Sequence, residues 1–293
     1  MSITASMVKE LREMTGAGMM ECKKALVETD GNLDAAVENL RKSGAAKAAK
    51  KSGRVAAEGV IKLATSDDNN AAVIVEINCE TDFVAKDANF LEFSDLVTQT
   101  ALAEKSADVD ALQSSEVNGK SIEQIRTDLI AKIGENIQIR RLQHVNSEGG
   151  LIGAYLHGTK IGVLVAAKDA STDLAKDVAM HVAAANPEFL SSDQVPGDVL
   201  EKEKGILIAQ AQDSGKPAEI IEKMVEGRMR KYLAEITLLG QNFVKDPDVT
   251  VEKLLKTNNA SVSGYVRFEV GEGIEKKVDN FVEEVMSQVR GDD

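Results

Sequence analysis

The chain has 293 residues, with 35 Lys and Arg against 48 Asp and Glu, so its formal net charge is -13. An excess of negative charge repels a phosphate backbone, which argues against a general nucleic-acid-binding protein. No apolar run reaches the ~18 residues of a transmembrane helix, and charges stand where a signal peptide would be apolar. Two widely spaced cysteines, Cys22 and Cys79, fit buried thiols in a reducing compartment, so we expect a cytoplasmic protein.

Charge is unevenly distributed along the sequence. Residues 1–54 contain ten basic and seven acidic residues, whereas the rest of the chain contains 25 basic and 41 acidic residues. Aromatic residues make up only 3% of the chain, and Trp is absent. We therefore expect a helix-rich protein with a basic head, an acidic body and a core of Ala, Val, Ile and Leu.

Apolar residues recur at helical spacing in three short segments of the head. The three stripes are Met7, Val8, Leu11 and Met14; Cys22, Ala25, Leu26 and Thr29; and Leu33, Ala36, Val37 and Leu40. Gly16 and Gly31 predict breaks between them. Asn32 can cap the third helix, and Gly44 can supply the left-handed residue that ends it. These features predict a three-helix module in residues 1–54.

The end of the head is strongly basic. Residues 42–54 contain five Lys or Arg and no acidic residue, and they are rich in alanine. We interpret them as a linker with helical tendency. The linker is either a solvated tether or a docking site for an acidic partner.

The hydrophobic period changes from 3.6 to 2 after the linker. The elements expected in residues 55–145 are a hairpin of strands 58–65 and 71–78, helices at 88–105 and 121–133, and a strand at 135–144. A similar order then recurs as a hairpin of 151–157 and 160–167, a helix at 172–185 and a strand at 261–270. We infer an α+β fold with a duplicated core of small antiparallel sheets, whose second copy occupies 146–185 and 236–270.

Residues 186–235 interrupt the second copy. The ranges 198–213 and 217–235 are helical in composition, and Gly215 and Pro217 suit the end of one helix and the start of the next. An antiparallel helical hairpin is therefore predicted. The apolar stripe of its second helix consists of Ile220, Ile221, Met224, Val225 and the stem of Arg228. The partner helix, the core or a second copy of the chain must cover that stripe.

The last segment, residues 271–293, has the pattern of an amphipathic helix. Its apolar face is formed by Ile274, Val278, Phe281, Val282, Val285 and Val289. Apolar residues at this spacing need a surface to pack against. We expect a separate C-terminal helical module.

Residue patterns typical of enzymes and cofactor sites are missing from the sequence. His144, His157 and His181 lack metal-ligand spacing, and neither a P-loop nor a GxSxG elbow occurs. We expect no bound metal, no cofactor and no enzyme activity.

One segment departs from the local pattern. Cys79-Glu80-Thr81-Asp82-Phe83-Val84-Ala85-Lys86 connects a predicted strand to a predicted helix. Phe83, beside Asp82, is either held outward on a rigid scaffold or packed beneath the helix that Thr81 or Asp82 caps. The residues themselves leave both arrangements open.

Two longer motifs resemble the signatures of a known family. Residues 15–26, Thr-Gly-Ala-Gly-Met-Met-Glu-Cys-Lys-Lys-Ala-Leu, and residues 78–85, Asn-Cys-Glu-Thr-Asp-Phe-Val-Ala, are similar to those of the bacterial elongation factor Ts family. Further stretches agree at 132–136, at 157–158 with 161–167, and at 267–275. The resemblance thus extends from the head to the tail of the chain.

The resemblance implies a guanine-nucleotide exchange factor that binds the GTPase elongation factor Tu and promotes GDP release during protein synthesis. It implies that the head resembles a ubiquitin-associated fold and contacts the GTPase domain through Arg12, Met19 and Met20. Asp82 and Phe83 would insert near the magnesium site of that GTPase.

The same resemblance assigns three further regions. The segment around His157 would dock on another domain of the partner, and residues 271–293 would also touch the GTPase. The hairpin at 186–235 would be a self-association element, which makes a homodimer an expectation.

Two rival functions follow from single features. An RNA-binding protein would use Arg41, Lys42, Lys47, Lys50, Lys51 and Arg54. The acidic remainder of the chain argues against it. An adaptor for ubiquitin-like partners would use the three-helix head but would leave the duplicated core and Phe83 without a role. We therefore predict an exchange factor that contacts neither nucleic acid nor membrane.

Overall fold

The computed structural model describes residues 3–212 and 217–275 of the chain. Two compact units are present: unit 1 comprises Met1–Val60, Glu76–Arg141 and Val270–Asp293, and unit 2 comprises Ile61–Val75 and Leu142–Glu269. No helix in the described ranges is long and apolar enough to cross a membrane. The C-terminal helix predicted for 271–293 lies almost entirely outside the described residues. The finer division of the chain by sequence stays a prediction.

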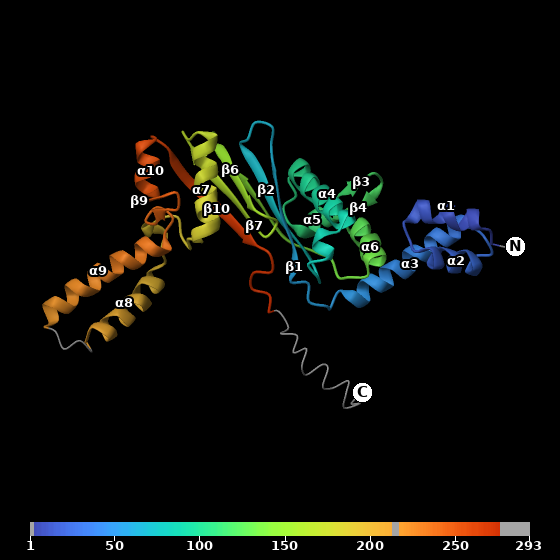
Figure 1. Cartoon of the computed structure of the whole chain (residues 1–293), viewed down its shortest axis with the longest axis horizontal. Helices are drawn as coiled ribbons and strands as arrows, with labels where there is room; N and C mark the ends of the chain where they lie inside the picture. The colour runs from blue at the N-terminus through green and yellow to red at the C-terminus, as the bar shows by residue number, and fades with distance from the viewer. Residues whose placement is uncertain (1–2, 213–216, 276–293) are drawn as a thin grey trace, which may run out of the picture. The chain divides into compact units, whose positions relative to one another are not determined.

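The head folds as three helices, α1 (Ala5–Thr15), α2 (Met19–Glu28) and α3 (Leu33–Lys51) (Figure 1). Its core contains members of all three predicted stripes: Val8, Leu11, Cys22, Ala25, Leu26 and Ala36. Gly16 ends α1 in the left-handed conformation, and the Asn32 side chain accepts the Ala35 N–H at the start of α3. The predicted break and cap are therefore confirmed.

Gly44 does not end the third helix as expected. It is buried within α3, which continues to Lys51, so most of the predicted linker is helical. A side chain at Gly44 would lie 3.5 Å from the Cβ of Ala131 in α6 (Ile122–Ile133). Packing of these small residues stabilises the extra turns, because tertiary contacts outweigh the weak helix propensity of a single glycine.

The first sheet has the strand order β1-β2-β5. Its strands are β1 (Glu58–Thr65), β2 (Ala71–Cys79) and β5 (Gln138–Asn146). Between β2 and β5 lie the 3-10 helix η1 (Val84–Lys86), α4 (Ala88–Glu104), α5 (Val109–Ser114), β3 (Glu116–Val117), β4 (Lys120–Ser121) and α6. The predicted strands and long helices are present, whereas α5 and the β3–β4 hairpin were not predicted.

The second sheet is antiparallel and has the order β10-β7-β6. Its strands are β6 (Leu151–His157), β7 (Ile161–Lys168) and β10 (Ser261–Glu269), and α7 (Thr172–Ala185) packs on it (Figure 1). A Cβ at Gly153 would lie 2.3 Å from the Ala175 carbonyl oxygen, so only glycine permits this close approach. In both sheets the third strand pairs with the second strand of the hairpin. This shared order supports the duplication within the α+β fold.

The insertion in unit 2 forms a helical hairpin of α8 (Gly197–Gln212) and α9 (Ala218–Ile236) (Figure 1). The two helices cover each other through buried Leu207, Ala211 and Val225. Ile221 packs against this cluster, but Ile220 is exposed. Part of the predicted stripe is therefore covered by the partner helix. Gly215 lies outside the described residues.

Three short elements after the hairpin were not predicted: β8 (Asn242–Phe243), β9 (Asp246–Thr250) and α10 (Val251–Thr257). Buried His181 connects α7 to this region. Its Nδ1 accepts the Val244 N–H at 3.1 Å, and its Nε2 lies 3.0 Å from Gln241 Oε1. Burial lowers the pKa of His181, so the neutral ring is favoured, with its proton on Nε2. His181 is thus a structural residue.

Candidate functional site

The loop between β2 and α4 exposes a large aromatic side chain. Phe83 is 81% exposed at the start of η1, whereas Ala85 and Phe90 are buried. This high exposure shows that Phe83 does not pack beneath α4. The packed arrangement considered from the sequence is therefore wrong.

The neighbouring polar residues do not have the capping roles considered for them. Asp87 caps α4 by accepting the N–H groups of Asn89 and Phe90. The hydrogen bond from the Asn89 side chain lowers the pKa of Asp87 despite the opposing effect of burial. Asp82 is exposed and pairs with Lys86 at 2.8 Å. We call Asp82 and Phe83 the tip.

Exposed methionines surround the turn between α1 and α2. Met19 and Met20 are 57% and 75% exposed, and Arg12 is exposed on α1. Met14, which the sequence placed in the core stripe, is also exposed. Flexible thioether side chains gathered at a surface are typical of protein-binding sites. The position of Met14, two residues before the helix-ending Gly16, was the sequence signal that could have placed it here.

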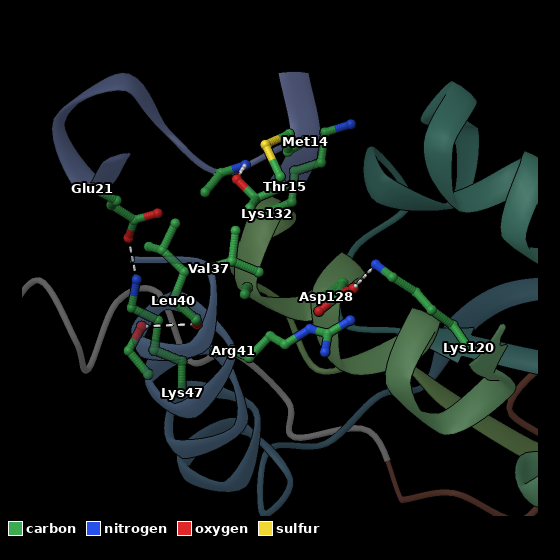
Figure 2. A pocket seen from close by; sticks show the side chains of 15 residues that line it. Met14, Thr15, Glu21, Val37, Leu40, Arg41, Lys47, Lys120, Asp128 and Lys132 are labelled. Atoms are coloured by element: carbon green, nitrogen blue, oxygen red, sulfur yellow. Dashed lines mark hydrogen bonds and ion pairs between the residues drawn. The ribbon is translucent and has the colours of Figure 1, made fainter. Parts of the chain in front are cut away.

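A cavity of about 240 Å³ lies between this turn, α3 and α6 (Figure 2). Charge pairs close its sides: Lys47 with Glu21, and Lys120 with Asp128 at 2.7 Å. Figure 2 shows the Arg41 side chain reaching toward Asp128. Because ion pairs within unit 1 already engage both acidic residues of its lining, we interpret the cavity as a gap between packed helices rather than as a ligand site.

The basic residues of the segment predicted as a linker, 42–54, also form ion pairs and hydrogen bonds within unit 1. Lys42 pairs with Glu38 at 2.8 Å, and Lys51 donates to the Gly134 carbonyl at 2.6 Å. These contacts, with those of Lys47, leave fewer cations for a phosphate backbone.

His157 lies at the end of β6 in unit 2 and is exposed. Its Nδ1 is 3.3 Å from the Tyr155 hydroxyl. The other predicted contact residues all belong to unit 1, on α1, α2 and the β2–η1 loop. Each of the six residues is thus exposed on the unit to which it belongs. Among the described residues, His, Cys, Asp and Glu form no cluster suited to a metal ion.

Sequence reasoning missed a buried carboxylate in unit 1. Glu76 of β2 is fully buried and accepts hydrogen bonds from Arg140 Nη1 at 2.9 Å, Arg141 Nε at 2.6 Å and the Gly271 N–H at 2.8 Å. Burial alone would raise the pKa of Glu76, but these hydrogen bonds outweigh it and lower the pKa below 4.5. Glu76 therefore fixes residues 270–272 to the first sheet.

Comparison with known proteins places the chain in a family. The family model described as "Elongation factor TS" matches residues 80–272. Elongation factor Ts of Hydrogenovibrio crunogenus is 62% identical over 286 residues, which cover 97% of each chain. Elongation factor Ts of Thioalkalivibrio sulfidiphilus is 59% identical over 292 residues, covering 99% of this chain and all of the relative. Elongation factor Ts of Legionella pneumophila is 54% identical over 290 residues, or 99% of each. The matches run through both units and the tip, and the chain therefore belongs to the elongation factor Ts family.

Proposed function

We propose that the chain is a cytoplasmic guanine-nucleotide exchange factor that binds elongation factor Tu and promotes GDP release, so that GTP can rebind during protein synthesis. The observation that carries the proposal is the exposure of Phe83 beside Asp82 at a short strand-to-helix connection. An exposed aromatic ring on a scaffold is suited to fill a partner's pocket and to become a binding hot spot. Family membership supports the identity of that partner.

Exchange is achieved by binding energy alone. A GTPase that holds GDP with nanomolar affinity binds it by about 12 kcal/mol, so spontaneous release is slow. Accelerating release ~10⁴-fold requires lowering the barrier by about 5.5 kcal/mol. The Phe83 ring supplies apolar contact to the state that lacks nucleotide, and the Asp82 carboxylate repels the phosphate region. Linkage is reciprocal: the factor by which the chain lowers the affinity of the GTPase for nucleotide is also the factor by which nucleotide lowers the affinity of the GTPase for the chain. Incoming GTP therefore releases the chain from the GTPase without any covalent step.

The experiment that tests this function is stopped-flow release of a fluorescent GDP from preloaded elongation factor Tu. We expect the release rate to rise with the concentration of the chain, up to ~10⁴-fold at saturation. Release from the GTPase alone gives the baseline. A rate that stays at this baseline at saturating concentrations of the chain would refute the proposal.

We propose the exposed methionines of the head as a second contact with the GTPase. Met19→Ala is expected to weaken the complex about tenfold, since a partly buried anchor at an interface contributes ~1–2 kcal/mol. Val27→Ala is a matched control, because Val27 lies on the same helix and is also 57% exposed. Isothermal titration calorimetry measures both dissociation constants. Equal affinities of the two variants would contradict a contact at Met19.

Two further contacts belong to the proposal. His157 would dock on another domain of the partner, because it is exposed at the end of strand β6. The hairpin of α8 and α9 would pair with a second copy of the chain. A groove of about 550 Å³ supports this self-association; its lining combines apolar Ile208, Ala218, Ile221, Val225 and Met229 with charged Lys204, Glu222 and Glu226.

A further inference from the structure

We infer that Glu135 is a positioning residue of the exchange reaction: its carboxylate holds the loop that presents the tip. Glu135 follows Gly134, which ends α6 in the left-handed conformation. Its Oε2 accepts the N–H groups of Glu80 and Thr81, both at 3.1 Å. Its Oε1 accepts the Thr81 hydroxyl at 2.7 Å. One side chain thus fixes the two residues that directly precede Asp82.

The restraint continues beyond the tip. The Thr81 hydroxyl oxygen accepts the N–H of Val84 at 3.3 Å. Asp82 and Phe83 therefore lie between two restrained residues, Thr81 and Val84. The Thr81 hydroxyl, which Glu135 orients, contributes to the restraint on both. Hydrogen bonds between backbone N–H groups and a carboxylate are stronger than neutral ones, which makes the arrangement specific.

A second carboxylate completes the connection in the opposite direction. Glu80 Oε1 accepts the Asn136 N–H at 2.6 Å, so Glu80 and the pair Glu135–Asn136 bond each other reciprocally. The Asn136 side chain donates to the Arg54 carbonyl at 2.7 Å. The loop of the tip is thereby tied to the start of β5 and to the end of the head, all within unit 1.

This support matters because Phe83 has little packing of its own. A ring that is 81% exposed keeps its direction only if the backbone below it is fixed. An anchor that is ordered before binding avoids the entropy cost of being ordered in the complex. Glu135 therefore promotes GDP release without being required to touch the partner. This inference rests on the proposed function and deepens it.

The test uses full-length Glu135→Ala in the stopped-flow release assay. We expect stimulated release to slow about tenfold, because a displaced anchor loses most of the benefit of preorganisation. Hydrogen exchange should accelerate at the amides of Glu80 and Thr81. Glu123→Ala is the matched control: it removes another carboxylate of unit 1, one that pairs with Arg126 at 2.6 Å and makes no contact with the tip. The control should leave the release rate unchanged.

Non-additivity distinguishes positioning from general destabilisation. Adding Glu135→Ala to the double variant Asp82→Ala with Phe83→Ala should slow release no further, because the restraint acts on release through the two residues of the tip. If Glu135→Ala does not fold, Thr81→Val removes the hydroxyl contacts to Glu135 and to the Val84 N–H in an isosteric residue, and slower stimulated release is again expected, while the amides of Glu80 and Thr81 keep their carboxylate acceptor. Partial rescue by Glu135→Gln, which keeps one acceptor oxygen, also supports the inference.

Three outcomes separate the possible failures. Normal release by Glu135→Ala, with Phe83→Ala slow, overturns the positioning role of Glu135 but leaves the proposed function intact. Normal release by Phe83→Ala refutes the tip itself, and the inference with it. Slower release on adding Glu135→Ala to the double variant that lacks both tip side chains overturns the inference too, because it assigns Glu135 an effect independent of the tip.

Discussion

Replacing both Asp82 and Phe83 with alanine is expected to slow stimulated GDP release from elongation factor Tu at least ~10-fold, a loss of at least ~1.4 kcal/mol of transition-state stabilisation. The aromatic ring is the larger contributor, because truncating a buried interface aromatic commonly costs ~2 kcal/mol or more. Asp82 contributes less, since its carboxylate already pairs with Lys86 in the free protein. Stopped-flow release of fluorescent GDP measures the effect.

The fold should survive the double substitution. Both side chains are exposed, and the hydrogen bonds that shape the loop come from Thr81, Glu80 and Glu135 rather than from the tip. Circular dichroism and the thermal midpoint should match those of the unmodified chain. Lys86→Ala is a useful control, because it breaks the ion pair but leaves the ring and the carboxylate in place. An unchanged release rate for the double variant would contradict the assignment of the tip.

Local pattern was sufficient to predict the long elements. The helix at Thr172–Ala185 and the hairpin strands follow from hydrophobic period and from turn residues between them, both of which depend on near neighbours in the sequence. Helix α3 continues through Gly44 because α6, some eighty residues away, packs the small side chain of Ala131 against it. Packing against such a distant residue cannot be predicted from the hydrophobic period around Gly44.

The candidate site was predictable only in part. The residues of the tip are recognisable in the sequence, but whether Phe83 faces outward depends on which side chains fill the space beneath η1. Ala85 and Phe90 of this segment are buried and Phe83 is exposed, and hydrophobic period alone does not reveal which of them faces inward. Glu135 is more remote still, because its bonds to Glu80 and Thr81 join residues more than fifty positions apart. The resemblance at residues 132–136 identifies the segment that contains Glu135, but it does not indicate which residues the Glu135 side chain contacts.

Glu76 is the buried charge with the largest expected effect on stability. Glu76→Ala is expected to lower the free energy of unfolding by ~3–5 kcal/mol, the usual cost of removing one partner from a buried ion pair. The variant leaves the partly buried Arg140 and Arg141 guanidinium groups without their shared acceptor and the Gly271 N–H without its carboxylate. Denaturant unfolding at neutral pH measures the change. A loss below ~1 kcal/mol would contradict a stabilising role for this network.

Acidification gives an independent measure of the same network. Because the pKa of Glu76 is lower in the folded chain than its ordinary value of 4.5, the ionised carboxylate stabilises the fold above pH 4.5. This contribution should fall as the pH drops below 4.5 and should vanish below the pKa of the folded state, where both states bind the proton. Glu76→Gln should therefore be less stable at neutral pH but should lose less stability on acidification than the unmodified chain.

Glu38→Gln is the control: hydrogen bonding to Lys42 also lowers the pKa of Glu38, but this carboxylate is exposed and solvent screens the pair. Parallel pH profiles for the unmodified chain and Glu76→Gln would show that the buried carboxylate does not account for the acid sensitivity, and the link between residues 270–272 and the first sheet would then need another source.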